Sequence, residues 1–326
     1  MEQNNFFESR TDLSALSDAV NGIRQEIGKI IVGQKNMVDL LIASVLANSH
    51  VLIEGVPGVA KTLTARLLSK SLDVPFSRIQ FTPDLMPSDV LGTSVFNPRD
   101  ASFEFRPGPI FSNIVLIDEI NRAPAKTQSA LFEVMEERQV TIDGRTYPMS
   151  SPFIVVATQN PVEHEGTYRL PEAQLDRFLF KIHVPYPTPE EEVQILNGHH
   201  RMGQGSQLDP VNKILDAARI ATLQQQVRNL LVDEKLIDFI TKIVTETRNN
   251  KSIFLGASPR ASIGILNGAK AIAAMRGRDF VTPEDILFVV PPVLRHRIVL
   301  TPDREMEGLT PDDVIQQVVQ GIEVPR

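Results

Sequence analysis

The octapeptide GVPGVAKT at residues 55–62 combines glycines with a lysine and a threonine at the spacing of a phosphate-binding loop. Such loops read G-x-x-x-x-G-K-[ST]; here the first glycine, Lys61 and Thr62 are kept, while Ala60 replaces the second glycine. In such loops backbone N–H groups surround the phosphates, the lysine adds a positive charge, and the threonine coordinates magnesium. We therefore expect Lys61 and Thr62 to contact phosphate and metal, although a chance glycine-rich turn could carry the same letters.

Ala60 decides whether this loop can still bind an anion. A glycine is needed before the lysine only if that residue has a positive φ, or if a Cβ atom would collide with phosphate. We predict a negative, helical φ for Ala60, which would let its methyl group point away from the anion. On that prediction the loop binds phosphate despite the substitution.

A second motif, IVLIDEI at residues 114–120, is an apolar run that ends in Asp118 and Glu119. On a central strand, acidic residues belong at the end where the chain reaches the surface. Asp118 suits the magnesium shell, and Glu119 suits the base that polarises an attacking water. An ordinary solvated strand end is the alternative, and the preceding Lys61 and Thr62 disfavour it.

Three further polar residues suit phosphoryl transfer. The run VVATQNP places Thr158 and Asn160 at the end of another strand, where an amide can orient water against a γ-phosphate. Asn160 could equally initiate a turn before the following proline. Arg177 and Arg260 could each be a surface cation, but an arginine commonly stabilises the charge that develops in phosphoryl transfer, and a neighbouring subunit can supply it.

The surrounding elements must position these residues at one edge of a sheet. Five apolar runs alternate with helical segments, which predicts a parallel sheet with helices on both faces. Helices are expected before it, at residues 12–29 and 34–48. The five predicted strands lie within HVLIEG (50–55), SRIQF (77–81), NIVLIDE (113–119), PFIVVATQN (152–160) and RFLFKIHV (177–184).

Prolines and glycines between residues 185 and 212 mark a change of pattern, after which no buried strand is expected. Thr282 and Thr310, each followed by proline and acidic residues, predict helix N-termini there. We expect a flexible N-terminus at 1–10, an α/β core at 11–188, a linker at 189–210 and a helical domain at 211–326.

The composition narrows the class of partner. The 326 residues include 33 basic and 40 acidic side chains, a formal net charge of −7, which gives no overall attraction to nucleic acid or anionic membranes. Cysteine is absent, which excludes disulfides and thiolate metal sites. The N-terminal residues lack the features of a signal peptide, and the longest apolar region is too short to span a bilayer. We expect a cytoplasmic protein.

The order of the motifs GVPGVAKT, IVLIDEINRAP, VVATQNP, LPEAQLDRF and GASPRA resembles the AAA+ ATPases, and most closely their MoxR branch. The resemblance extends from IVGQKN at residues 31–36 to the C-terminal helices. It implies a phosphate-binding-loop core with a five-stranded parallel sheet, followed by an all-helical lid domain. MoxR-like loops frequently read G-x-P-G-x-A-K-T, so the resemblance implies that Ala60 is a family variant.

The resemblance also implies individual roles. Asp118 and Glu119 are similar to the Walker B pair, with Thr62 and Asp118 on the metal, and Asn160 is similar to sensor 1. Arg177 is similar to an arginine finger that acts in trans, with Arg169 as the alternative, and Arg260 is similar to sensor 2 on the lid. The implied nucleotide-binding residues are Ile31, Val32, Gly55, Val56, Pro57, Gly58, Val59, Ala60, Lys61, Thr62 and Leu63.

Two insertions are implied as well. The segment at about residues 82–110 matches a helix-2 insert, and the segment at about 138–150 matches a hairpin before sensor 1. Asp143-Gly144 in the latter is typical of a type I′ turn. In the former, Phe96, Phe103 and Phe105 alternate as on a strand, which favours an ordered structure over a long surface loop. Both would project from one face of a ring.

These features favour an ATP-driven remodelling chaperone that uses ATP and Mg²⁺ in a ring, with hydrolysis moving the lid against the core. The resemblance implies a homo-hexamer, and as clients proteins with von Willebrand factor A domains or metal-dependent enzymes that need activation. The alternative is a nucleic-acid motor, but Arg145 alone at the hairpin tip and the acidic chain disfavour it. GTP is disfavoured because the N-K-x-D signature is absent.

Overall fold

The computed structural model describes residues 12–161, 168, 170–202, 208 and 210–325. Its main sheet is parallel throughout and has the strand order β2-β5-β8-β1-β9. The five predicted strands and the predicted fold class are confirmed. The strands are β1 (His50–Gly55), β2 (Phe76–Gln80), β5 (Ile114–Asp118), β8 (Ile154–Gln159) and β9 (Phe178–Val184).

The apolar strands face two separate cores because successive side chains point to opposite sides of a sheet. Leu116 of β5 belongs to the core beneath the N-terminal helices, whereas its neighbour Val115 belongs to the other core. The first core is covered by α1 (Ser14–Gly28), α2 (Lys35–Leu46) and α3 (Lys61–Ser71), and the second by α5 (Ala125–Glu137). The predicted helices at 12–29 and 34–48 correspond to α1 and α2.

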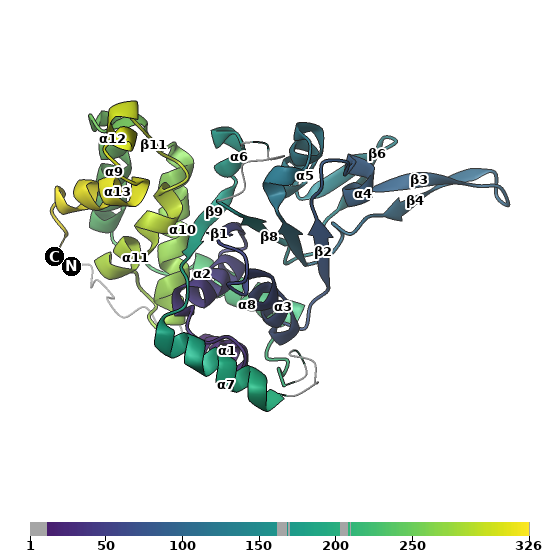
Figure 1. Ribbon diagram of the computed structural model, residues 1–326, viewed down its shortest axis with the longest axis horizontal. Coiled ribbons are helices and arrows are strands. Elements are labelled where there is room, and N and C mark those ends of the chain that lie inside the picture. Colours follow the sequence, from purple (N-terminus) through teal and green to yellow (C-terminus); the bar gives the residue numbers. More distant parts are fainter. Residues whose placement is uncertain (1–11, 162–167, 169, 203–207, 209, 326) are drawn as a thin grey trace, which may run out of the picture.

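Two antiparallel hairpins interrupt the α/β pattern, as expected for the two insertions. The first follows α4 (Pro87–Leu91) and pairs β3 (Gly92–Asn97) with β4 (Ser102–Pro107); Figure 1 shows it extending away from the sheet, opposite the C-terminal helices. The second pairs β6 (Gln139–Ile142) with β7 (Arg145–Pro148). Its turn has positive φ at Asp143 (51°) and Gly144 (73°), as a type I′ turn requires.

The hairpins contact each other. The Ser94 hydroxyl donates to the Asp143 carboxylate, and the rings of Phe105 and Tyr147 lie 4.3 Å apart between centroids. The alternation of phenylalanines therefore predicted correctly that the first insertion is ordered. The rings of Phe96 and Phe103 contact each other near the tip of this hairpin in a tilted arrangement, with centroids 5.4 Å apart, and stay exposed by 51% and 69%.

The C-terminal part is helical, with one correction to the expected linker. Residues 189–202 form helix α7 (Pro189–Met202), so most of the segment expected as a linker at 189–210 is helical. The prolines that suggested a linker end at Pro189, the first helical position, where a missing N–H costs no hydrogen bond. Glu190 to Glu192 then place negative charge in the first turn, where the helix dipole favours it.

Six further helices follow, and the expected N-termini at Thr282 and Thr310 both form capping boxes. A short antiparallel pair, β10 (Ile253–Leu255) with β11 (Val299–Leu300), was not predicted, because runs of two or three residues leave no periodic signal. No described helix combines the length and apolarity needed to cross a membrane. The six helices that follow α7 are α8 (Ala217–Arg228), α9 (Glu234–Asn249), α10 (Pro259–Met275), α11 (Pro283–Leu294), α12 (Pro302–Met306) and α13 (Pro311–Gln320).

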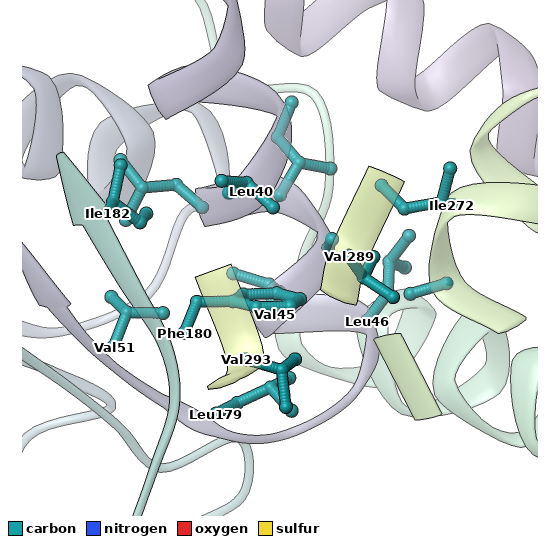
Figure 2. Packing of buried hydrophobic residues seen from close by; sticks show 14 of the residues in the cluster. Leu40, Val45, Leu46, Val51, Leu179, Phe180, Ile182, Ile272, Val289 and Val293 are labelled. Atoms are coloured by element: carbon teal, nitrogen blue, oxygen red, sulfur yellow. The ribbon is translucent and has the colours of Figure 1, made fainter. Parts of the chain in front are cut away.

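The helical lid and the sheet share one hydrophobic core. Figure 2 shows α10 and α11 contributing Ile272, Val289 and Val293 to the same cluster as Phe180 of β9. Gly268 of α10 lets the helix approach closely, since a Cβ there would lie 3.1 Å from the Phe180 ring. Each fully buried side chain of this size contributes about 1.5–3 kcal/mol, so separating α10 and α11 from the sheet would be costly. The lid helices and the sheet are therefore packed as one body in this structure.

Candidate nucleotide-binding site

A cavity of about 380 Å³ lies where the phosphate-binding loop meets the carboxyl ends of β2, β5 and β8. Parallel strands bring their carboxyl ends to one edge, so residues far apart in the chain meet there. Nine predicted site residues line this cavity. Four belong to the loop and the start of the following helix, namely Pro57, Gly58, Ala60 and Leu63, and the five with predicted chemical roles are Lys61, Thr62, Asp118, Glu119 and Asn160.

A second cavity, of about 260 Å³, lies on the other side of the same loop. Ile31 and Val32, predicted to contact adenine, line it together with Val59 and Leu63. Its opposite wall is α7, which contributes Gln194, Ile195, Gly198 and His199. This wall was not predicted, because residues 189–210 were expected to form a linker.

The loop backbone explains two of its glycines. A Cβ at Gly55 would lie 2.9 Å from the carbonyl oxygen of Val184, so β1 approaches β9 too closely for a side chain. Gly58 has φ of +87°, which favours glycine. Beside Gly55, Glu54 is half-buried against β9 and forms ion pairs with Lys181 and His183. Burial alone would raise the pKa of Glu54, but His183 and Lys181 outweigh it and lower that pKa to about 2.

The prediction for Ala60 is wrong. Its φ is 61° and its ψ is 21°, a left-handed conformation immediately before α3. The turn from loop to helix needs a left-handed residue so that successive N–H groups point into the loop. An alanine there costs about 1–2 kcal/mol. The methyl group packs against the core and borders both cavities, so the loop keeps its left-handed turn despite the substitution.

Lys61 and Thr62 are the first two residues of α3, and their side chains reach the loop backbone and Asp118, respectively. The Lys61 ammonium lies over the loop and donates to the carbonyl oxygens of Gly55 and Val56. The Thr62 hydroxyl lies 3.2 Å from Asp118 Oδ1. A hydroxyl beside a carboxylate is the donor set that Mg²⁺ prefers, so these two residues fit a magnesium site.

Asp118 is the most connected carboxylate of the site, with a side chain that is 8% exposed. The hydroxyl of Thr158 donates to Oδ1 over 3.1 Å, and Arg78 Nε donates to Oδ2 over 2.6 Å. Arg78 was not predicted as a site residue. In SRIQF, however, it alternates with buried Ile79, which places Arg78 and Gln80 on one face of β2.

Glu119 takes a left-handed conformation at the end of β5, with φ of 57° and ψ of 53°. Its carboxylate accepts from Gln80 Nε2 at 2.8 Å and pairs with Arg122 at 3.2 Å. Its N–H donates to the hydroxyl of Thr158, which fixes the backbone. Strained residues of this kind cluster at functional sites. Gln80 and Arg122 are thus two further residues that only the structure associates with Glu119.

The two predicted arginines lie elsewhere. Arg177 and Arg260 line neither cavity; both pair with Glu136, near the end of α5. The alternative finger, Arg169, and the N-terminal residues 1–10 lie outside the described residues. The structure therefore brings Lys61, Thr62, Asp118, Glu119 and Asn160 together around the loop and places the two arginines in a separate region.

A five-stranded parallel sheet, a phosphate-binding loop facing an Asp-Glu strand end, and a helical lid together define an AAA+ ATPase. Residues 50–180 match the family described as "ATPase family associated with various cellular activities (AAA)", and residues 245–318 match the AAA lid domain. The chain belongs to the MoxR family of AAA+ ATPases, as the resemblance predicted.

Three similar proteins illustrate this membership. Chaperone MoxR1 of Mycobacterium tuberculosis is 48% identical over 310 residues, which cover 92% of this chain and 81% of that protein. Protein MoxR of Methylorubrum extorquens is 30% identical over 331 residues, covering 94% and 96% of the two chains. A crystal structure of a candidate ATPase from Cytophaga hutchinsonii is 41% identical, with a TM-score of 0.88 and coverage of 96% and 97%.

Proposed function

We propose that the protein hydrolyses ATP with Mg²⁺ and uses the energy to remodel or activate client proteins. The observation that carries the proposal is the single cavity lined by Lys61, Thr62, Asp118, Glu119 and Asn160. Lys61 holds the β- and γ-phosphates, and Thr62 with Asp118 would hold Mg²⁺, which neutralises charge on the phosphate oxygens when bound. Glu119 polarises water for in-line attack on the γ-phosphorus, Asn160 orients that water, and ADP and phosphate leave.

The nucleotide base enters the second cavity. Ile31, Val32 and Leu63 supply apolar walls of the kind that suit a purine, and α7 covers the opposite side. We favour adenine because the residues that would read guanine are absent from the sequence.

The active form is a ring, which we propose to be a homo-hexamer. Arg177 and Arg260 are apart from both cavities of their own subunit, which supports their delivery to a neighbouring nucleotide. An arginine supplied in trans stabilises the charge that develops on the transferring phosphoryl group. Because lid and sheet share one core, we expect hydrolysis to move whole subunits against one another, rather than the lid against its own sheet as first expected.

We propose that the clients are proteins, acted on in the cytoplasm through the β3–β4 hairpin. The exposed aromatic pair Phe96 and Phe103 near its tip offers apolar contact area. A relative named as a chaperone supports protein clients. A partner with a von Willebrand factor A domain is the client class that the family resemblance suggests.

The test is Glu119→Gln, which should bind ATP normally and lower turnover about 100-fold or more, the usual contribution of a general base. Purified wild type should hydrolyse ATP only with Mg²⁺. The trapped variant should then capture a von Willebrand factor A protein from lysate, and Lys61→Ala should not. ATP-dependent recovery of nucleic acid instead would contradict the chaperone proposal.

A further inference from the structure

Glu136 lies on the last turn of α5 and contacts both arginines that we assign to the neighbouring site. Its Oε2 lies 3.4 Å from Arg177 Nε, and its Oε1 pairs with Arg260 Nη2. Each carboxylate oxygen of Glu136 therefore contacts one guanidinium group. The two cations come from distant parts of the chain, Arg177 from the start of β9 and Arg260 from the first turn of α10.

The backbone next to each arginine is fixed independently of Glu136. Asp176 accepts a hydrogen bond from Ser258 over 3.0 Å and from Arg297 Nε over 2.6 Å. Asp176 immediately precedes Arg177, and Ser258 is the N-cap of the helix that begins with Pro259 and Arg260. Arg297 is buried and also donates to the carbonyl oxygens of Phe178 and Leu179. Only the arginine side chains are left for Glu136 to orient.

Two further groups contact the Arg177 side chain, one on α5 and one on the short helix α6 (Glu172–Leu175). Phe132, one turn before Glu136, lies with its ring centroid 6.0 Å from the Arg177 guanidinium carbon. The carbonyl oxygen of Ala173 accepts from Arg177 Nη1 over 2.9 Å. Arg177 Nε is buried and forms no hydrogen bond with the described residues, so its 3.4 Å contact with Glu136 is an ion pair that is weaker than a charged hydrogen bond. The side chains stay accessible, with exposed fractions of 26% for Arg177, 37% for Glu136 and 48% for Arg260.

Two guanidinium groups side by side repel each other, and a carboxylate between them offsets that repulsion. We propose that Glu136 is a positioning residue, whose carboxylate holds Arg177 and Arg260 as a pair directed at the nucleotide of the neighbouring subunit. This inference rests on the proposed function. Without the charge of Glu136 the arginines adopt other rotamers, and the transition state loses pre-organised charge.

The test compares Glu136→Gln and Glu136→Asp with a matched control, Glu137→Gln. Glu137 is exposed, and in the described part of the chain it forms no ion pair, so the control removes a neighbouring charge from the same helix. We expect Glu136→Gln to lower kcat about tenfold with KM for ATP within about twofold, because the arginines act in the transition state. Glu136→Asp should recover part of the loss, and Glu137→Gln should match wild type.

Mixing tests the direction of action. Glu136→Gln subunits keep Glu119, and Glu119→Gln subunits keep the arginine pair. A site in a mixed ring is therefore complete wherever a Glu119→Gln subunit supplies its arginine pair to the nucleotide of a Glu136→Gln subunit. We expect ATPase activity above the weighted sum of the two pure proteins.

Two results would overturn the proposal, namely wild-type kcat in Glu136→Gln or additive activity in the mixture. A folding defect would not produce recovery on mixing. Failure of the proposed function is seen separately, since wild type would then hydrolyse no ATP or Lys61→Ala would hydrolyse it normally.

Discussion

The residues that line the phosphate cavity come from the loop after β1 and from the ends of β2, β5 and β8 in one subunit. Arg177 and Arg260, in contrast, meet at Glu136 where α5, the start of β9 and the lid helix α10 converge. The first region gathers lysine, hydroxyl, carboxylates and amide in one place. The second gathers only cations and their counter-ion.

We expect the first region to determine nucleotide binding and the second region, around Arg177, Arg260 and Glu136, to determine turnover. The cavity around the phosphate-binding loop and the adjoining base cavity belong to one subunit and together hold every group that the proposed nucleotide contact needs, so one subunit should bind ATP by itself. The arginine region holds charge that is useful only when a transition state develops, so it should affect turnover and depend on assembly. Variants in the two regions should therefore differ in which kinetic constant they change.

The largest effect is expected at the phosphate cavity. Lys61→Ala removes the ammonium that we propose contacts the phosphates, and ATP binding should become undetectable by isothermal titration calorimetry at millimolar concentrations. Lys242→Ala, on the exposed face of α9, is the matched control and should bind as wild type. Near-normal affinity in Lys61→Ala would contradict the assignment of the loop.

In the arginine region, Arg177→Ala should leave ATP affinity unchanged and lower kcat about 1,000-fold, the lower range for an arginine finger. The measurement is steady-state ATPase with nucleotide affinity determined separately. Mixing Arg177→Ala with Glu119→Gln subunits should restore activity if the arginine acts in trans. An absence of recovery would favour Arg169 or action within one subunit.

The end of α5 should also be sensitive to acid. His50 of β1 accepts from the Val155 N–H through Nδ1 and donates to the Met135 carbonyl through Nε2, so it is neutral. Burial, aided by the positive charge of Arg138, lowers its pKa from 6.5 to about 4. Below pH 6.5 the unfolded chain therefore binds a proton that the folded chain excludes, and stability falls as pH decreases toward 4.

From this shift we expect His50 to make the free energy of unfolding about 2 kcal/mol smaller at pH 5 than at pH 7.5. Urea denaturation at both pH values measures this difference in the free energy of unfolding. His50→Gln should lose that part of the pH dependence, whereas His200→Gln, at an exposed position on α7, should keep it. Burial also lowers the pKa of His296, so a smaller dependence should remain in His50→Gln. If the free energy of unfolding changed equally between the two pH values in His50→Gln and wild type, this prediction would be contradicted.

The smallest effect concerns the loop backbone. Ala60→Gly should relieve the left-handed alanine and raise stability by about 1 kcal/mol with ATP binding retained. Gly58→Ala should have the opposite sign, because Gly58 has a positive φ and an added Cβ would meet no neighbour, so the change tests strain alone. Thermal denaturation compares the two. Destabilisation by Ala60→Gly would show that the methyl packing outweighs the backbone strain.

Much of the fold was predictable because its signals are local. Apolar runs predicted the five strands, Asp143-Gly144 the hairpin turn, and Thr282 and Thr310 the helix N-termini. Local rules failed at Ala60, whose φ is set by the turn into α3, and at residues 189–202, where Pro189 starts a helix instead of preventing one.

The sequence by itself determined the strand order along the chain and the residue types at each strand end, because side-chain periodicity and motif spacing are properties of neighbouring residues. It also carried the family resemblance. Only the tertiary structure decided which strand ends meet, that α7 closes the second cavity, and that Glu136 pairs two arginines 83 residues apart. Packing brings such groups together across long separations, and no pattern along the chain records which charges will become neighbours.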